Sequence, residues 1–571
     1  MPTDNEADTF SFALTSITFS DGSTVALEPS SLFIITGPNS SGKSVALSEI
    51  HRLYMDDRSI VQPYRVIKQA TFSRVGTAKA FADWLRERYP SSFTNDIEYF
   101  NLGGQGEVGP TATDFSIDRT AGKCHVALIH RLDTETRLRL ASETSSVNFA
   151  AGQVTSYIHY LQRDPRLAST ISDLVYSAFR RNLIINFGGG QQVWFHVGEE
   201  PPRNSLNDRV SQEYLTELRK QPRLDQEGDG IRSFVGTLLA SKVAARPLML
   251  IDEPEAFLHP PQARKLGSIL AESASTGNRQ LIVATHSSDI IQGAMDASQR
   301  VVVCRMTRTG DVNRVSVLDK SALEELWSRP LLRSSVAING LFHAGAVICE
   351  GDADCRFYET LISRLERSTK TAFDLHFVHG GGKGALASFA RAYKALSIPT
   401  AVIADLDLLK NQDEFKAIIS ALGVDPSELG QLSYRVAAAL ANRKPLLPIQ
   451  QFADKVCDVL EVAKSKKRLD SQDRKQLHSL MEEASDWSEA KRYGLTRLSG
   501  TELTTGKDLL DKCKQLGLFI VPEGELERWW REGPPDKAEW ICQAIGQINN
   551  QPQLFSEASK FMAEVRRFLV D

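Results

Sequence analysis

The chain has 571 residues, of which 42% are hydrophobic and 24% are charged, and its formal net charge is -4. This length exceeds what one hydrophobic core supports, so we expect two or more domains. The charge excludes a globally basic chain; the best linear basic patch runs from Lys464 to Arg474, and a solvated helix face explains that run equally well.

Cysteine usage and the amino terminus indicate a cellular compartment. The seven cysteines are scattered and none forms a C-x-x-C pair, which excludes a disulfide framework and a structural zinc site. The acidic start, Met1 to Glu6, lacks the apolar segment of a secretory signal, and no apolar run reaches the roughly 20 residues that span a bilayer. We therefore expect a cytoplasmic protein with no membrane partner.

The first half of the chain alternates predicted strands and helices. A buried strand over Leu32–Thr36 leads into a glycine-rich turn and a helix over Ser44–Met55, and further strands are expected over Pro247–Ile251 and Gln280–Thr285. This order predicts an α/β fold with a mostly parallel sheet. We assign residues 1–340 to this domain, with helical and β insertions at about 56–220.

A phosphate-binding loop lies between the first of these strands and its helix. The segment fits G-x-x-x-x-G-K-S, in which loop N–H groups cradle phosphates, the lysine reaches the β and γ phosphates and the serine binds Mg²⁺. The sequence therefore predicts an ATP site formed by Gly37, Pro38, Asn39, Ser40, Ser41, Gly42, Lys43 and Ser44.

Three residues at later strand ends would complete this site. Asp252 ends an apolar strand, where a carboxylate that orders Mg²⁺ must lie, and Glu253 beside it is a candidate general base. His286 ends the next strand and is predicted to contact the γ phosphate. With Lys43, these residues separate an ABC-type ATPase head from other P-loop classes.

ABC-type sites are completed by a signature loop from a second molecule. The segment from Gly228 to Ser233 has the right position, and we expect Gly230 and Ser233 to meet the γ phosphate across a dimer interface. It departs from the usual Ser-Gly-Gly-Gln pattern, so ATP binding is better supported than rapid hydrolysis. A homodimer or a higher homo-oligomer is expected, and the sequence does not choose between them.

A second β/α series begins near residue 341 and is assigned to residues 341–571, with a helical insertion at about 426–512. Glu350 and Asp354 follow one predicted strand, and Asp405 and Asp407 follow another. Carboxylates gathered at strand ends bind hard divalent ions that stabilise charge on a phosphodiester, so we expect Mg²⁺ or Mn²⁺ here. Glu350 could also act as a general acid or base.

These acids resemble a Toprim domain, the metal-dependent nicking and joining module of topoisomerases and primases. The resemblance lies on Val347–Asp354, the Gly380-Gly381-Gly382 loop and Val402–Asp407. An ABC ATPase followed by Toprim, a Rossmann-like fold, is similar to the OLD (overcoming lysogenization defect) nuclease family, which includes the Gabija nuclease subunit and effectors of some retrons. The motif Asp252 to Pro260 supports this resemblance.

The resemblance implies an ATP-regulated, metal-dependent DNA endonuclease of antiphage defence, with catalytic roles for Glu253, Glu350, Asp405 and Asp407. It also implies a late metal-binding carboxylate, for which we favour Glu527, and a late lysine, for which Lys507 and Lys560 both remain candidates. Related systems pair such a chain with a helicase or with a reverse transcriptase and its DNA product. The alternatives are a non-cutting SMC/RecF-like DNA-binding ATPase and an RNA-directed nuclease.

Overall fold

The computed structural model divides the chain into two compact units, Met1–Lys320 and Ser321–Asp571. This division falls before the boundary that we expected at residue 340. The structure describes residues 9–318, 321 and 338–570, apart from 56–63, 95–96, 103–106, 109–124, 150–153, 203–207, 244–245, 278, 442–446, 465, 467 and 486. Within these residues, no helix is both long enough and apolar enough to cross a membrane.

A six-stranded sheet forms the centre of the first unit, in the order β16-β15-β3-β14-β13-β8. All neighbours pair in parallel except β15 and β16, which are antiparallel. The strand β3 is buried along its whole length, as expected for a central strand covered on both faces. The strands are β3 (Leu32–Thr36), β8 (Ile129–Leu132), β13 (Leu248–Asp252), β14 (Gln280–Ala284), β15 (Val301–Thr309) and β16 (Val312–Val317).

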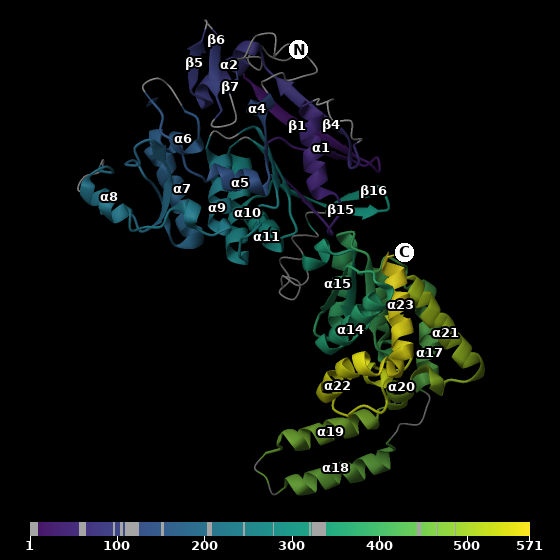
Figure 1. The fold of residues 1–571 in the computed structure, drawn as a ribbon. Coiled ribbons are helices and arrows are strands. Elements are labelled where there is room, and N and C mark those ends of the chain that lie inside the picture. Colours follow the sequence, from purple (N-terminus) through teal and green to yellow (C-terminus); the bar gives the residue numbers. More distant parts are fainter. Residues whose placement is uncertain are drawn as a thin grey trace. The chain divides into compact units, whose positions relative to one another are not determined.

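Helices flank this sheet, and Figure 1 shows three of them, α9, α10 and α11, gathered beside α5. The helix α1 follows β3 directly, and α10 and α11 connect the parallel strands β13, β14 and β15 as right-handed β/α units require. Their bounds are α1 (Lys43–Met55), α5 (Thr134–Leu140), α9 (Asp229–Lys242), α10 (Pro260–Thr276) and α11 (Ser288–Ala297).

The first unit also contains smaller sheets and helices outside the six-stranded sheet. A three-stranded antiparallel sheet has the order β2-β1-β4, with β1 (Ser11–Phe19), β2 (Thr24–Ala26) and β4 (Ile67–Val75). Short sheets pair β5-β6-β7, β10 with β12, and β9 with β11. The remaining elements are α2 (Ala78–Arg88), β5 (Ser91–Thr94), β6 (Ile97–Asn101), β7 (Glu107–Val108), α4 (His125–Leu128), β9 (Thr144–Ser145), α6 (Tyr157–Arg163), α7 (Pro165–Phe179), β10 (Asn182–Ile185), β11 (Gln192–Val193), β12 (Phe195–Gly198) and α8 (Gln212–Leu218).

The second unit contains a four-stranded parallel sheet in the order β18-β17-β19-β20. Because the strands are parallel, their carboxyl ends meet at one edge, where the predicted acids follow β17, β19 and β20. The strands are β17 (Gly345–Cys349), β18 (Leu375–His379), β19 (Thr400–Ala404) and β20 (Leu518–Ile520), and the helices packed on them include α14 (Asp352–Thr369), α15 (Lys383–Ala395), α22 (Lys537–Asn550) and α23 (Ser556–Val570).

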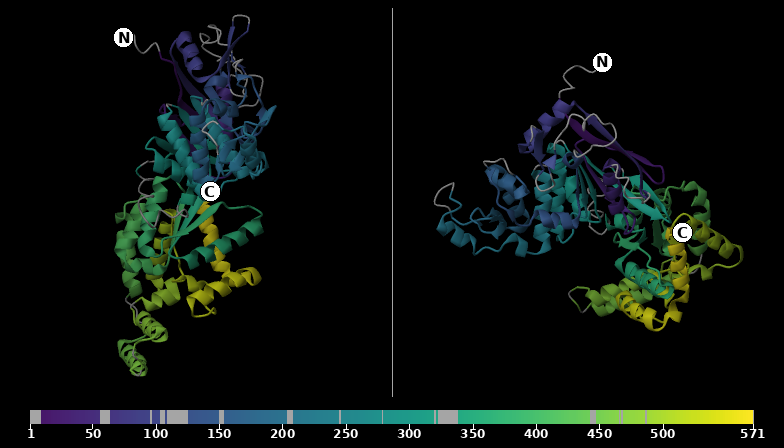
Figure 2. Two further views of the ribbon diagram at one scale, coloured as in Figure 1. Left: turned by 90° about the vertical axis from the view of Figure 1, so that its left-hand side faces the viewer. Right: turned by 45° about the horizontal axis from the view of Figure 1, so that its top comes forward.

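Helices occupy the chain between β19 and β20. Two of them, α18 and α19, form a hairpin that extends away from the sheet of this unit, which the turned views of Figure 2 also show. The hairpin packs mainly on itself, since Ala463 is the one described residue of α18 that is buried. The helices are α16 (Gln412–Ala421), α17 (Ser427–Ala441), α18 (Ile449–Ala463), α19 (Ser471–Glu483), α20 (Ser488–Tyr493) and α21 (Gly500–Gln515).

Candidate nucleotide and metal sites

The phosphate-binding loop has the conformation that its glycines predict. Gly37 has a φ of 140°, and a Cβ there would lie 2.0 Å from the carbonyl oxygen of Met306, so only glycine fits against β15. Lys43 opens α1, and its Nζ donates to the carbonyl oxygens of Gly37 and Pro38, both at 2.9 Å. The loop therefore wraps around the lysine ammonium. It lies at the amino end of α1, where free backbone N–H groups favour the binding of phosphate.

The predicted Mg²⁺-binding pair is brought together from distant parts of the chain. Ser44 Oγ donates to Asp252 Oδ1 at 2.9 Å, which joins the start of α1 to the end of β13. Burial raises the pKa of Asp252, while the hydrogen bond from Ser44 opposes that rise. A hydroxyl and a carboxylate in this arrangement form a hard oxygen pair that suits Mg²⁺.

Glu253 and His286 also meet. His286 Nδ1 lies 3.6 Å from Glu253 Oε1, and both side chains are about two-fifths exposed, at 40% and 43%. Glu253 has a φ of 47°, in the left-handed region that non-glycine residues adopt uncommonly and at a cost in free energy. Glu253, the candidate base, and His286, the candidate γ-phosphate contact, therefore lie side by side and are both accessible to solvent.

Two further residues support the turn from 252 to 258, which we call the Walker B turn. Glu255 Oε1 accepts from Thr285 Oγ1 at 2.7 Å and from the backbone N–H of His286 at 3.0 Å, so it fixes the His286 segment. Arg137, which is fully buried, donates to the carbonyl oxygens of Asp252 and Glu253. Glu255 lies within the motif that carried the family resemblance, whereas no sequence signal identifies Arg137.

The predicted signature segment needs a correction at Ser233. It lies inside α9, is fully buried, and its Oγ accepts from Arg137 Nε at 3.1 Å, so it is not available to a phosphate of another molecule. Gly230 lies in the first turn of α9, and a Cβ there would approach the carbonyl oxygen of Phe257 to 2.6 Å. Its lack of a side chain is therefore explained by close packing on the Walker B turn.

Three acids form a compact cluster in the second unit. Carboxylate oxygens of Glu350, Asp405 and Asp407 lie within 4.8 Å of one another. Glu350 follows β17, Asp405 follows β19, and Glu350 Oε1 accepts the backbone N–H of Asp405 at 2.9 Å. We call Glu350, Asp405 and Asp407 the acid triad.

Asp354 and Glu527, which we expected to share one metal-binding set with these acids, lie outside the triad. The helix α14 begins at Asp352, earlier than expected, so Asp354 occupies its first turn and is 6% exposed. Glu527 follows β20, and its Oε1 lies 3.4 Å from Lys537 Nζ. Charges of both Lys537 and Glu527 act on the buried Asp354 carboxyl, whose pKa is raised chiefly by burial.

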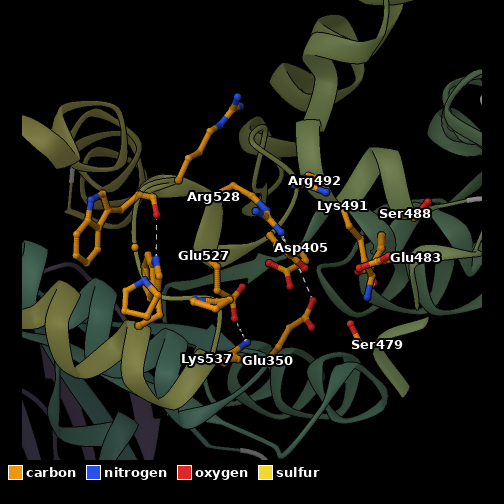
Figure 3. A pocket seen from close by; sticks show the side chains of 18 of the residues that line it. Glu350, Asp405, Ser479, Glu483, Ser488, Lys491, Arg492, Glu527, Arg528 and Lys537 are labelled. Atoms are coloured by element: carbon orange, nitrogen blue, oxygen red, sulfur yellow. Dashed lines mark hydrogen bonds and ion pairs between the residues drawn. The ribbon is translucent and has the colours of Figure 1, made fainter. Parts of the chain in front are cut away.

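A cavity of about 700 Å³ opens over the triad, and Figure 3 shows its lining side chains. Both acidic and cationic side chains line its walls. Lys383 contacts Asp407 and lies 3.8 Å from Glu350, while Lys491 Nζ lies 3.3 Å from Asp407. The cationic lining residues are Lys383, Lys491, Arg492, Arg528, Arg531 and Lys537.

The structure brings to the cavity a different late lysine from the two sequence candidates. Lys560 pairs with Glu557 on α23 and is 72% exposed, and Lys507 is exposed on α21. Neither lines the cavity, whereas Lys537, at the start of α22, does. Asp536 is the N-cap that starts α22, and its carboxylate accepts the backbone N–H groups of Ala538 and Glu539. No motif in the sequence singles out the neighbouring Lys537.

The electrostatics of the triad fit a divalent cation. Burial raises the pKa of Glu350 to about 7, with Lys383 opposing the rise and Asp407 adding to it. Burial and the Glu350 charge raise the pKa of Asp405 well above its ordinary value. Burial would also raise the pKa of Asp407, but Lys383 and Lys491 outweigh it and the pKa is lowered. Clustered carboxylates that repel one another in this way can hold a divalent metal ion.

Two protein families match separate parts of the chain. Residues 198–291 match an AAA domain family described as putative AbiEii toxin, Type IV TA system. Residues 341–407 match the TOPRIM domain of overcoming lysogenization defect protein-like proteins. The first match includes the Walker B turn and His286, and the second includes the whole acid triad.

Two curated relatives each match about three-tenths of the chain. The chain is 28% identical over 170 residues to the Old nuclease of Escherichia phage P2, and 32% identical over 199 residues to the OLD nuclease of Thermus scotoductus. These matches cover 29% and 32% of this chain, but only 28% and 36% of the relatives.

Among solved structures, the SMC head domain from Thermotoga maritima covers 55% of this chain and 98% of its own, at 12% identity and a TM-score of 0.28. An SMC head bound to the C-winged helix domain of ScpA covers 54% and 99%, at 11% identity and a TM-score of 0.34. The sheet topology and the two family matches identify the fold. The chain combines an AAA domain with an OLD-like TOPRIM domain, which confirms its resemblance to the OLD family of ATPase–Toprim proteins.

Proposed function

We propose that the protein is an ATP-regulated, divalent-metal-dependent DNA endonuclease that acts in antiphage defence. The observation that carries this proposal is the acid triad, whose oxygens lie within 4.8 Å of one another at the floor of a cavity with six cationic side chains. Acids bind a metal ion and cations bind phosphate, so one cavity offers both halves of a phosphodiester-cleaving site.

The chain's own side chains supply orientation and proton transfer. Lys491, on α20, lies beside Asp407, and Lys537, at the start of α22, lies beside Glu527 in the lining of the same cavity. A backbone phosphate in the cavity would be held between these ammonium groups and the acids. Glu350, with a pKa of about 7, can hold or release a proton at Oε2, because its Oε1 is engaged by the backbone N–H of Asp405. A bound Mg²⁺ or Mn²⁺ would neutralise charge on the phosphodiester and lower the pKa of a bound water.

The nucleotide site supports regulation by ATP. Ser44 and Asp252 would order Mg²⁺, Glu253 would polarise the attacking water and His286 would contact the γ phosphate. Gly228 is the N-cap of α9 and Gly230 lies in its first turn, and we propose that this helix end faces the nucleotide of a second copy in a homodimer. ATP binding would then set the geometry of the dimer and thereby of the DNA-cutting unit.

The test is a plasmid-nicking assay crossed with metal and nucleotide. Nicking of supercoiled DNA should need Mg²⁺ or Mn²⁺ and should vanish in Asp405→Ala, while the variant still binds ATP. The same assay with ATP, a non-hydrolysable analogue and Glu253→Gln measures the coupling. Cleavage that survives Asp405→Ala would remove the nuclease assignment, and cleavage that ignores nucleotide in every combination would remove the regulation.

Two outcomes would redirect the proposal. DNA binding without any cleavage, in the presence of metal and intact acids, would favour a non-cutting DNA-binding ATPase. Cleavage of RNA at a higher rate than DNA would reassign the substrate, because the triad acts on the phosphodiester that both polymers share.

A further inference from the structure

A single buried guanidinium ties the Walker B turn to two helices of the first unit. Arg137 lies on α5, is fully buried, and uses all three of its nitrogens as donors. Its Nη1 donates to the carbonyl oxygen of Asp252 at 2.6 Å, and its Nη2 donates to the carbonyl oxygen of Glu253 at 3.0 Å. The backbone of the candidate general base is therefore held from inside the protein rather than by its own side chain.

The third nitrogen reaches a different element. Arg137 Nε donates to Ser233 Oγ at 3.1 Å, one turn along α9 from Gly230. The helices α5 and α9 also touch directly, since a Cβ on Gly236 would lie 2.0 Å from the carbonyl oxygen of Arg137. Because Gly236 leaves no gap between the helices, a shift of α9 must move Arg137 with it.

The planar guanidinium makes this connection specific. It joins two carbonyl oxygens and one hydroxyl in a fixed fork, with Thr134 Oγ1 accepting a further bond from Nη2 at 3.1 Å. A lysine at this position has a single nitrogen and cannot reproduce the fork. The turn that the fork holds contains Glu253 at a φ of 47°, a conformation that persists only when its surroundings impose it.

We propose that Arg137 is a positioning residue that holds Glu253 in its reactive place and makes that place depend on α9. This inference rests on the proposed ATP site. A contact made by a second molecule at the amino end of α9 would pass through Ser233 and Arg137 to the Walker B turn. Docking of the second copy would thereby align the candidate base without any contact to Glu253 itself.

The sharpest test removes the α9 contact alone. In Ser233→Ala, Arg137 keeps its bonds to the Walker B carbonyls but loses its bond to α9. The matched control is Ser241→Ala, the same substitution at a second fully buried serine of α9, whose Oγ donates only within its own helix, to the carbonyl oxygen of Leu238. Both variants are made in the full chain and compared by thermal unfolding, so that a general loss of stability is recognised.

Two readouts are expected to change in Ser233→Ala and not in Ser241→Ala. Amide hydrogen exchange of the peptide spanning residues 248–258 should become about fivefold faster, which corresponds to the loss of the one hydrogen bond that joins Arg137 to α9. The kcat for ATP hydrolysis should fall about tenfold while KM stays within twofold, because alignment rather than nucleotide binding is lost. Arg137→Lys, which keeps the charge but not the fork, should show both effects.

Unchanged exchange in Ser233→Ala would overturn the inference, as would faster exchange with an unchanged kcat. Equal changes in Ser241→Ala would also overturn it, because they would reveal a general loosening of α9. A wild-type protein that hydrolyses no ATP, but whose exchange responds to Ser233→Ala alone, would instead contradict the proposed ATPase activity and leave the mechanical link in place.

Discussion

Removing one charge from the acid triad should stabilise the metal-free protein. The carboxylate oxygens of the triad lie within 4.8 Å of one another, and two unit charges at that distance repel by about 3.5 kcal/mol at an effective dielectric constant of about 20. Asp405 has two such neighbours, and its pKa is raised well above the ordinary value by burial and by the charge of Glu350. At Asp407, Lys383 and Lys491 offset part of the repulsion. We therefore expect Asp405→Asn to raise the free energy of unfolding by about 2 to 3 kcal/mol at pH 8.

That gain corresponds to a melting temperature higher by about 5 to 10 °C for a unit of this size. The measurement is thermal unfolding in EDTA and again in Mn²⁺: the wild type should be stabilised by the metal, and Asp405→Asn should not. Asp352→Asn is the control, because Asp352 lies at the same edge of the sheet but is 57% exposed and pairs with Arg356. A destabilised Asp405→Asn in EDTA, or one that Mn²⁺ still stabilises, would refute the electrostatic account of the triad.

Three further outcomes follow from the same geometry. The pKa of Glu350 is about 7 when folded against an ordinary 4.5, so ionising it destabilises the metal-free fold as pH rises through that window. The melting temperature in EDTA should therefore be lower at pH 8 than at pH 6, and Mn²⁺ should raise the melting temperature more at pH 8. A higher melting temperature in EDTA at pH 8 than at pH 6 would contradict the burial of Glu350. Lys537→Gln should slow plasmid nicking about 100-fold, whereas Lys507→Gln and Lys560→Gln should stay within twofold; an equal loss in all three would point to general DNA attraction. Glu253→Gln should slow ATP hydrolysis about 100-fold with nucleotide affinity within threefold, measured by single-turnover hydrolysis and fluorescent-nucleotide binding.

Local sequence predicted the elements that carry the site well. The buried run Leu32–Thr36, the glycine loop and the helix after it appear as β3, the loop and α1, and the expected parallel sheets are confirmed in both units. A buried strand and a glycine turn each depend on a few neighbouring residues, so the sequence alone is enough to predict them.

Pairings across the fold were harder to predict. Asp354 shares the predicted acidic motif, yet the early start of α14 turns it inward toward Lys537, a residue 183 positions later in the chain. Ser233 lies in a glycine-rich segment of the kind that contacts phosphate, but it is buried and its hydroxyl accepts a hydrogen bond from Arg137. In both cases burial and a distant partner, which periodicity does not encode, decide the role of the side chain.

The sequence by itself determined which chemistry the chain carries: a loop that cradles phosphate, and carboxylates placed after apolar strands. The tertiary structure alone decided which acids form the triad, which lysines surround it, and that Arg137 braces the Walker B turn. The physical reason is that strand ends and loops are specified locally, whereas charge clusters form only when parallel strands bring their carboxyl ends to one edge and helices close over it.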